Sequence, residues 1–212
     1  MKRLDKKEAL DLLQNAPLYE LGELAYQKKL ALHPDKITTF VVDRNINYTN
    51  VCCIDCDFCA FYRHAKSADA YILPFEKIGE KIEELQSIGG TQILFQGGVH
   101  PKLTIEWYEE LVEWIAKHYP NITLHGFSAV EIAYIAKISK ISIKEVLQRL
   151  HAKGLFSIPG AGAEVLSDRV RDEIAPRKCD TQTWLEVHRQ AHKLGMKSTA
   201  TMMFGTLESD EE

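Results

Sequence analysis

The chain has 212 residues, of which 45% are hydrophobic and 26% are charged, with a net charge of −4 at pH 7. This is the composition of an ordinary globular protein, and it argues against a nucleic-acid partner, because such partners favour a basic patch. We expect a cytoplasmic enzyme, because no run of about 18 apolar residues could form a membrane span and the basic N-terminus lacks the apolar run of a signal peptide.

The first part of the chain is predicted to be helical. Apolar residues recur at helical spacing, with an interruption at Pro17. The His33–Lys36 stretch then breaks the pattern. We therefore expect an N-terminal helical segment over residues 1–36 and a main domain over residues 37–212.

The main domain alternates short apolar strands with amphipathic helices. Strands are predicted at 38–42, 45–51, 91–95, 122–124, 155–158 and 198–204. A capping box at Ser142 and Glu145 begins one of the helices between them. About five such units indicate an α/β fold with a parallel sheet. Because no glycine-rich dinucleotide fingerprint follows the first strand, a complete or partial (β/α) barrel is favoured.

Small, polar and sulfur-bearing residues collect where the predicted strands end. These stretches are 52–59, 96–98, 125–128, 160–164 and 205–208. In a barrel, active sites lie at the carboxyl ends of the strands, so these stretches predict one shared site. The acidic residues after the last strand are typical of the start of a helix, and we expect the sequence to be part of a longer protein.

Three cysteines form the most specific motif. Three residues separate Cys52 from Cys56, and two separate Cys56 from Cys59, so one loop could bring three thiolates to one metal centre. A [4Fe–4S] cluster usually takes four cysteines, and three would leave one iron open to another ligand. The same cysteines with His64 could instead bind zinc, and the cysteines alone leave both alternatives open. The remaining thiols, Cys53 and Cys179, are expected to be idle.

The wider pattern resembles the radical S-adenosylmethionine (SAM) superfamily. Its three-then-two cysteine spacing has an aromatic residue, Phe58, before the third cysteine. Further stretches narrow the resemblance to enzymes of the futalosine pathway of menaquinone biosynthesis and their deazaflavin-cofactor relatives. These stretches are 47–52, 56–63, 96–101, 125–132 and 159–178. The Phe61–Arg63 ending is more similar to dehypoxanthine futalosine cyclases than to aminofutalosine synthases.

The resemblance implies a partial radical SAM barrel with a [4Fe–4S] cluster on Cys52, Cys56 and Cys59 and with SAM on the open iron. It implies further SAM-binding residues, namely Phe58, Gly97, Gly98, Ser128, Glu131 and Glu164. The glycine pair would support the SAM amino group through its backbone, although it could also be an ordinary turn. Glu131 could equally be a solvated helix residue.

Two catalytic residues are also implied, His125 and Glu164. His125 could act as a general base or could be a packing histidine, and Glu164 would contact the ribose or sulfonium of SAM. Arg177 or Lys178 could pair with a substrate carboxylate.

The implied reaction is the cyclisation of dehypoxanthine futalosine through a 5′-deoxyadenosyl radical. Its electron would come from a flavodoxin- or ferredoxin-like donor. The alternatives are an aminofutalosine synthase, a subunit of deazaflavin-cofactor synthesis, and a zinc-stabilised binding protein.

Overall fold

A computed structural model describes residues 3–212, which divide into two compact units. One unit contains the described residues up to Phe40 together with Leu207–Glu212. Its helices are α1 (Lys6–Asn15) and α2 (Leu18–Leu32). A capping box of Asp5 and Glu8 begins α1, and Pro17 is the N-cap of α2, so the predicted helical character of this segment is confirmed. No helix within residues 3–212 is long and apolar enough to cross a membrane.

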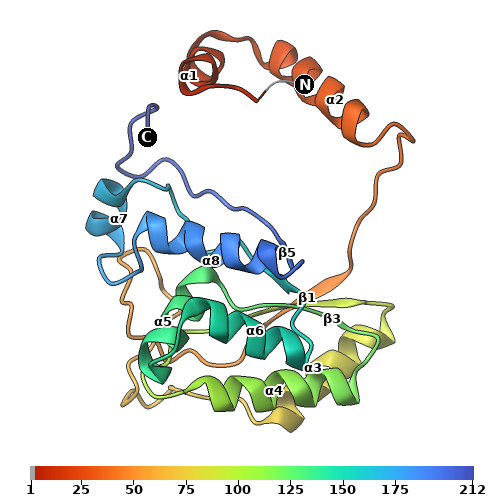
Figure 1. Cartoon of the computed structure of the whole chain (residues 1–212), viewed down its shortest axis with the longest axis vertical. Helices are drawn as coiled ribbons and strands as arrows, with labels where there is room; N and C mark the ends of the chain where they lie inside the picture. The colour runs from red at the N-terminus through yellow and green to blue at the C-terminus, as the bar shows by residue number, and fades with distance from the viewer. Residues whose placement is uncertain (1–2) are drawn as a thin grey trace. The chain divides into compact units, whose positions relative to one another are not determined.

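The other unit, Val41–Thr206, contains a five-stranded parallel sheet (Figure 1). Its strands are β1 (Asp43–Asn47), β2 (Gln92–Gln96), β3 (Thr123–Gly126), β4 (Ser157–Ile158) and β5 (Lys197–Ser198). Its helices are α3 (Phe75–Ser87), α4 (Ile105–His118), α5 (Ala129–Ser139), α6 (Ile143–Lys153), α7 (Asp168–Ile174) and α8 (Thr181–Lys193). The strands lie side by side in chain order. A sheet that grows in one direction is typical of a barrel and not of a doubly wound fold, so the predicted α/β partial barrel is confirmed.

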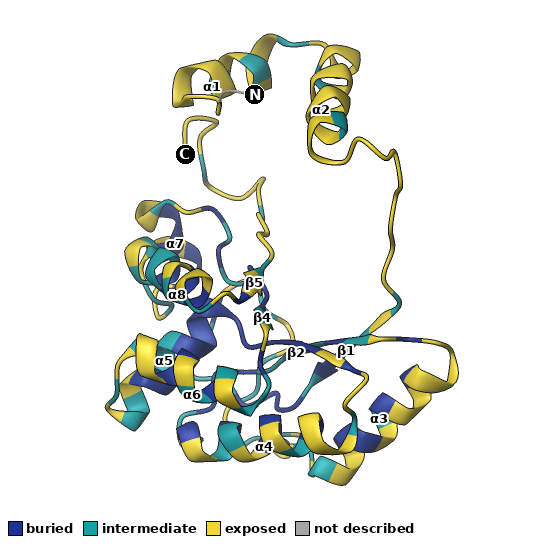
Figure 2. Cartoon of the chain, turned by 45° about the vertical axis from the view of Figure 1, so that its right-hand side comes forward, coloured by how far each residue is buried: buried dark blue, intermediate teal, exposed yellow. Residues whose placement is uncertain are grey.

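The hydrophobic core lies between the sheet and its helices. Ile93 and Phe95 of β2 are fully buried, and they belong to one cluster with Ile78 of α3, Leu111 of α4 and Leu147 of α6. Figure 2 shows the buried sides of these helices in dark blue and their outer sides in yellow. Burying a side chain of this size stabilises a fold by about 1.5–3 kcal/mol.

The opposite face of the sheet is more polar. The register aligns Asn45 with Leu94, Leu94 with His125, and His125 with Ser157. Because alternate residues of a strand point to opposite faces, these side chains share the face that does not carry Ile93 and Phe95. A polar inner surface therefore lies beside the carboxyl ends of the strands.

Some predicted elements differ from the structure. The strand predicted at 38–42 is wrong, because the first strand begins at Asp43, and β4 and β5 are shorter than predicted. The bounds of helix α5 were not predicted, because the helix is apolar nearly all round: Ala129, Val130, Ile132, Ile135 and Ala136 are all buried. A helix buried on several sides lacks the amphipathic period that reveals surface helices.

Candidate functional site

Four of the five predicted site stretches lie at one edge of the sheet, whereas the stretch 205–208 does not directly follow a strand, because β5 ends at Ser198. The cysteine loop follows β1, Gly97 and Gly98 follow β2, Ser128 follows β3, and Glu164 lies in the connection after β4. Because all the strands are parallel, these connections begin at the same edge.

The cysteine loop connects β1 to α3 and is anchored by its backbone. The N–H of Cys52 donates to the carbonyl of Arg63 (3.0 Å), and the N–H of Cys53 donates to the carbonyl of Val99 (3.0 Å). The first bond belongs to a parallel bridge between Val51 and Arg63. These bonds attach the start of the loop to its later part at Arg63 and to the segment that follows β2 at Val99.

The three predicted ligands lie close enough to affect one another. A turn joins Cys56 to Cys59, with an N–H to carbonyl distance of 3.0 Å. The pKa of the Cys56 thiol is raised to about 11, mainly by burial, with a smaller contribution from charge repulsion by Cys52 and Cys59 and an opposing effect of Lys178. A thiol with a raised pKa needs a strong positive centre to become a thiolate.

The donor set fits a cluster better than a single ion. Within residues 3–212, no three His, Cys, Asp or Glu side chains converge as ligands of one metal ion. The zinc alternative also needs His64, which is exposed. A four-iron cluster takes each thiolate on a different iron, and three thiolates from one loop, Cys52, Cys56 and Cys59, would hold three of its irons and leave the fourth open.

The glycine pair after β2 is in close contact with the chain around the cysteine loop. A Cβ on Gly97 would lie 2.7 Å from the ring of Tyr48, and one on Gly98 would lie 2.3 Å from the carbonyl oxygen of Val51. The N–H of Gly98 donates to the carbonyl of Thr49 (2.8 Å). Only glycine fits here without a shift of its neighbours, because Gly98 packs against the backbone of Val51 and Gly97 packs against the Tyr48 ring.

Glu131 joins three of the strand ends. Its carboxylate is 2% exposed and accepts hydrogen bonds from the Tyr48 hydroxyl (2.7 Å) and from the N–H of Gly97 (3.1 Å). Its other oxygen accepts from the N–H and the hydroxyl of Ser128, both at 2.7 Å, in a capping box that begins α5. The interpretation of Glu131 as a solvated helix residue is therefore wrong.

Glu164 and Lys178 form an ion pair beside the cysteines. The two side chains are 11% and 9% exposed. The Lys178 ammonium lies 5.1 Å from the centre of the Phe58 ring. Arg177, by contrast, is exposed and lies 3.4 Å from Asp55.

His125 is held on the inner face of the sheet. Its Nδ1 lies 2.8 Å from the hydroxyl of Ser157, and its Nε2 lies 3.4 Å from the hydroxyl of Thr199. Burial lowers the pKa of His125, which favours a neutral imidazole that can accept a proton.

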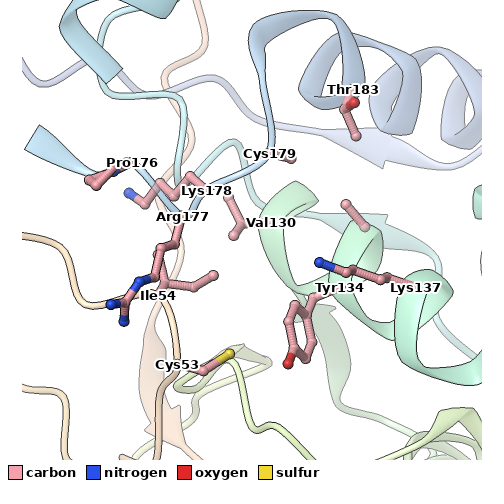
Figure 3. A pocket seen from close by; sticks show the side chains of 11 residues that line it. Cys53, Ile54, Val130, Tyr134, Lys137, Pro176, Arg177, Lys178, Cys179 and Thr183 are labelled. Atoms are coloured by element: carbon pink, nitrogen blue, oxygen red, sulfur yellow. The ribbon is translucent and has the colours of Figure 1, made fainter. Parts of the chain in front are cut away.

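A cavity of about 620 Å³ lies behind the cysteine loop (Figure 3). It is bounded by Cys53 and Ile54 of the loop, by Tyr134 on α5, and by residues 176–179. Cys53 lines this cavity, and the three predicted ligands do not. Its thiol therefore occupies different surroundings from those of its neighbour Cys52.

Sequence reasoning missed two residues that organise the site, Tyr48 and Arg171. Tyr48 is fully buried and its ring stacks on Phe95 at 5.3 Å. The Arg171 guanidinium donates to the carbonyls of Gly162, Ala163 and Cys179. No sequence pattern pointed to Tyr48. For Arg171 the only signal was an arginine within the short helix α7, and the sequence does not show which carbonyl groups it contacts.

Two named relatives match almost the whole chain. The cyclic dehypoxanthine futalosine synthase of Halalkalibacterium halodurans is 43% identical over 211 residues, covering 100% of this chain and 57% of that protein. The 5-amino-6-(D-ribitylamino)uracil–L-tyrosine 4-hydroxyphenyl transferase of Methanopyrus kandleri is 40% identical over 210 residues, covering 99% and 57%. The chain thus spans a little over half the length of the curated relatives it matches.

The fold and the family agree. The crystal structure of HydG, a maturase of the [FeFe]-hydrogenase, superposes with a TM-score of 0.74 at 17% identity, covering all of this chain and 45% of that one. The profile of the radical SAM superfamily matches residues 46–212. The chain therefore belongs to the radical SAM superfamily, whose cofactors are a [4Fe–4S] cluster and SAM.

Proposed function

We propose that Cys52, Cys56 and Cys59 hold the cluster and that SAM binds its open iron beside Gly97 and Gly98. The observation that carries this assignment is the exchange of backbone hydrogen bonds between the two segments. Cys53 donates to Val99 at 3.0 Å, and Gly98 donates to Thr49 at 2.8 Å. A glycine pair held against the cysteine loop leaves backbone carbonyls within reach of a ligand there.

The substrate we propose is dehypoxanthine futalosine, which the enzyme would cyclise. When bound, the cluster and SAM supply a 5′-deoxyadenosyl radical that abstracts hydrogen from the substrate. The 43% identical relative supports this choice. The resemblance of the Phe61–Arg63 stretch to that of the cyclases also supports it. The Arg63 guanidinium donates to the carbonyls of Phe61 (3.4 Å) and Tyr62 (2.8 Å), which holds the stretch in one conformation.

The side chains at the edge of the sheet have separate roles in this proposal. Neutral His125, on the inner face, would accept the proton that is lost when the cyclised substrate returns one electron to the cluster. Ser128 and Glu131 hold the SAM site together, and Glu164 and Phe58 border it. The electron for the cluster would come from a one-electron donor of the flavodoxin or ferredoxin type.

A second candidate is the transfer reaction named for the archaeal relatives. The relative from Methanopyrus kandleri matches 99% of the chain at 40% identity. The residues of this chain are therefore compatible with both reactions. Dehypoxanthine futalosine in one assay, and 5-amino-6-(D-ribitylamino)uracil with L-tyrosine in another, would separate the two. Product from the second pair alone would reject the cyclase proposal.

The decisive test of the site is analysis of iron, sulfide and zinc after anaerobic reconstitution. About four irons per chain, and an electron paramagnetic resonance (EPR) signal of the reduced protein that changes with SAM, are expected. Cys56→Ala should lose both, whereas the matched control Cys53→Ser should keep both. Zinc without iron, or a Cys56→Ala variant that still cleaves SAM with a cluster, would overturn the assignment.

A further inference from the structure

A buried ion pair lies against the turn that carries two of the cysteines. Lys178 comes from the connection between α7 and α8, and Glu164 comes from the loop after β4. The Lys178 ammonium lies 5.1 Å from the ring centre of Phe58, which stands between Cys56 and Cys59. One buried cation and one buried anion therefore border the predicted cluster ligands.

The pair is held in place from both sides. The Arg171 guanidinium donates to the carbonyls of Gly162 (2.8 Å) and Ala163 (2.5 Å), directly before Glu164, and to the carbonyl of Cys179 (2.5 Å), directly after Lys178. The backbone of Glu164 also has φ of +50°, in the left-handed region that favours glycine. Structure that over-determines such a conformation is typical of functional sites.

We propose that Lys178 and Glu164 set the reduction potential of the cluster with opposite signs, Lys178 raising it and Glu164 lowering it. The proposal rests on the assignment of the cluster to Cys52, Cys56 and Cys59. Reduction adds one electron to the cluster, so a nearby positive charge stabilises the reduced state and a negative charge destabilises it. Because both side chains are about nine-tenths buried, water screens these charges weakly.

The two charged groups are paired with each other, and the pair lies beside the turn that carries Phe58. Their opposite effects on the cluster therefore largely cancel. The net effect of the intact pair is small, and either charge alone has a large effect.

The test is an EPR-monitored redox titration of the reconstituted protein without SAM, so that SAM contacts do not contribute. Lys178→Met should shift the potential to more negative values, and Glu164→Gln to more positive values. Each shift should change the ratio of reduced to oxidised cluster on the order of tenfold at a fixed solution potential. The double variant should return close to the unaltered protein. Lys153→Met, which breaks the exposed pair with Glu113, is the control and should leave the potential unchanged.

Single variants that shift the potential in the same direction, or not at all, would overturn the proposal. If Lys178→Met does not load a cluster, Glu164→Gln alone decides it: a positive shift supports the proposal, and a negative or absent shift rejects it. The iron content of the unaltered protein is measured separately. A chain without a cluster contradicts the proposed function, whereas a loaded chain with unshifted variants contradicts only the role of this pair.

Discussion

Replacing Glu131 with glutamine tests whether one buried carboxylate holds the edge of the sheet together. The two oxygens of Glu131 accept four hydrogen bonds, from Tyr48, from Gly97 and twice from Ser128. Glutamine has nearly the same size, but one acceptor oxygen is replaced by an NH2 group that faces donors. At least one buried donor then loses its acceptor.

The expected loss follows from the hydrogen bonds and the desolvation of the charge. Leaving one buried donor unsatisfied costs about 1–3 kcal/mol. Burial raises the pKa of Glu131, against the stabilising donors of Ser128, Tyr48 and Gly97, so removing the charge returns part of that cost. We expect the variant to lose about 2 kcal/mol of unfolding free energy.

Urea unfolding of the metal-free protein, followed by circular dichroism, measures this loss. The matched control is Ser142→Ala, which removes only the cap of α6, where the hydroxyl accepts from the N–H of Glu145 at 3.1 Å. That control should cost about 1 kcal/mol. A loss of unfolding free energy in Glu131→Gln below about 0.5 kcal/mol, the usual range of surface substitutions, would refute the idea that Glu131 holds the edge of the sheet together.

Three other changes test separate parts of the structure. Gly98→Ala should abolish iron loading, because its Cβ would lie 2.3 Å from a backbone oxygen of the cysteine loop; Gly22→Ala, which meets nothing within 4 Å, should not. Leu147→Ala should cost about 2–5 kcal/mol in urea unfolding, because Leu147 is fully buried. Burial lowers the pKa of His188, so its stabilisation is complete above the unfolded value of about 6.5 and is lost as the pH falls. Unfolding free energies measured from about pH 7.5 to about pH 5.5 should therefore decline less in His188→Gln, and an equal decline would contradict this reasoning.

The parts of the site that sequence predicted are those carried by local patterns. The spacing of Cys52, Cys56 and Cys59 is visible within one loop, and Gly97 with Gly98 directly follows a short apolar strand. In a parallel sheet the carboxyl ends of all strands lie at one edge, so the fold class alone predicts that residues following the strands come together. The positions of these residues could thus be deduced before any contact was known.

The parts that sequence could not predict depend on partners far apart in the chain. The hydroxyl of Tyr48 donates to the carboxylate of Glu131, which lies 83 residues away in the sequence. Nothing in the sequence around either residue predicts this contact. Lys178 looked like a surface cation or a ligand for a substrate carboxylate, yet it pairs with Glu164. Periodicity reports which face of an element is buried, and it carries no information about which polar groups meet there.

The anchoring of the cysteine loop bears on whether the metal is needed for folding. The loop is fixed by its backbone to Arg63 and Val99, and the main core, which includes Phe95 and Leu147, contains none of the three ligands. A structural zinc site supplies folding energy directly, so its protein unfolds when the metal is removed. Here the sheet and its helices should fold first and the cluster should be added to a finished site. We therefore expect the metal-free protein to unfold cooperatively in urea. A metal-free protein without cooperative unfolding would show that the metal is structural and would restore the zinc alternative.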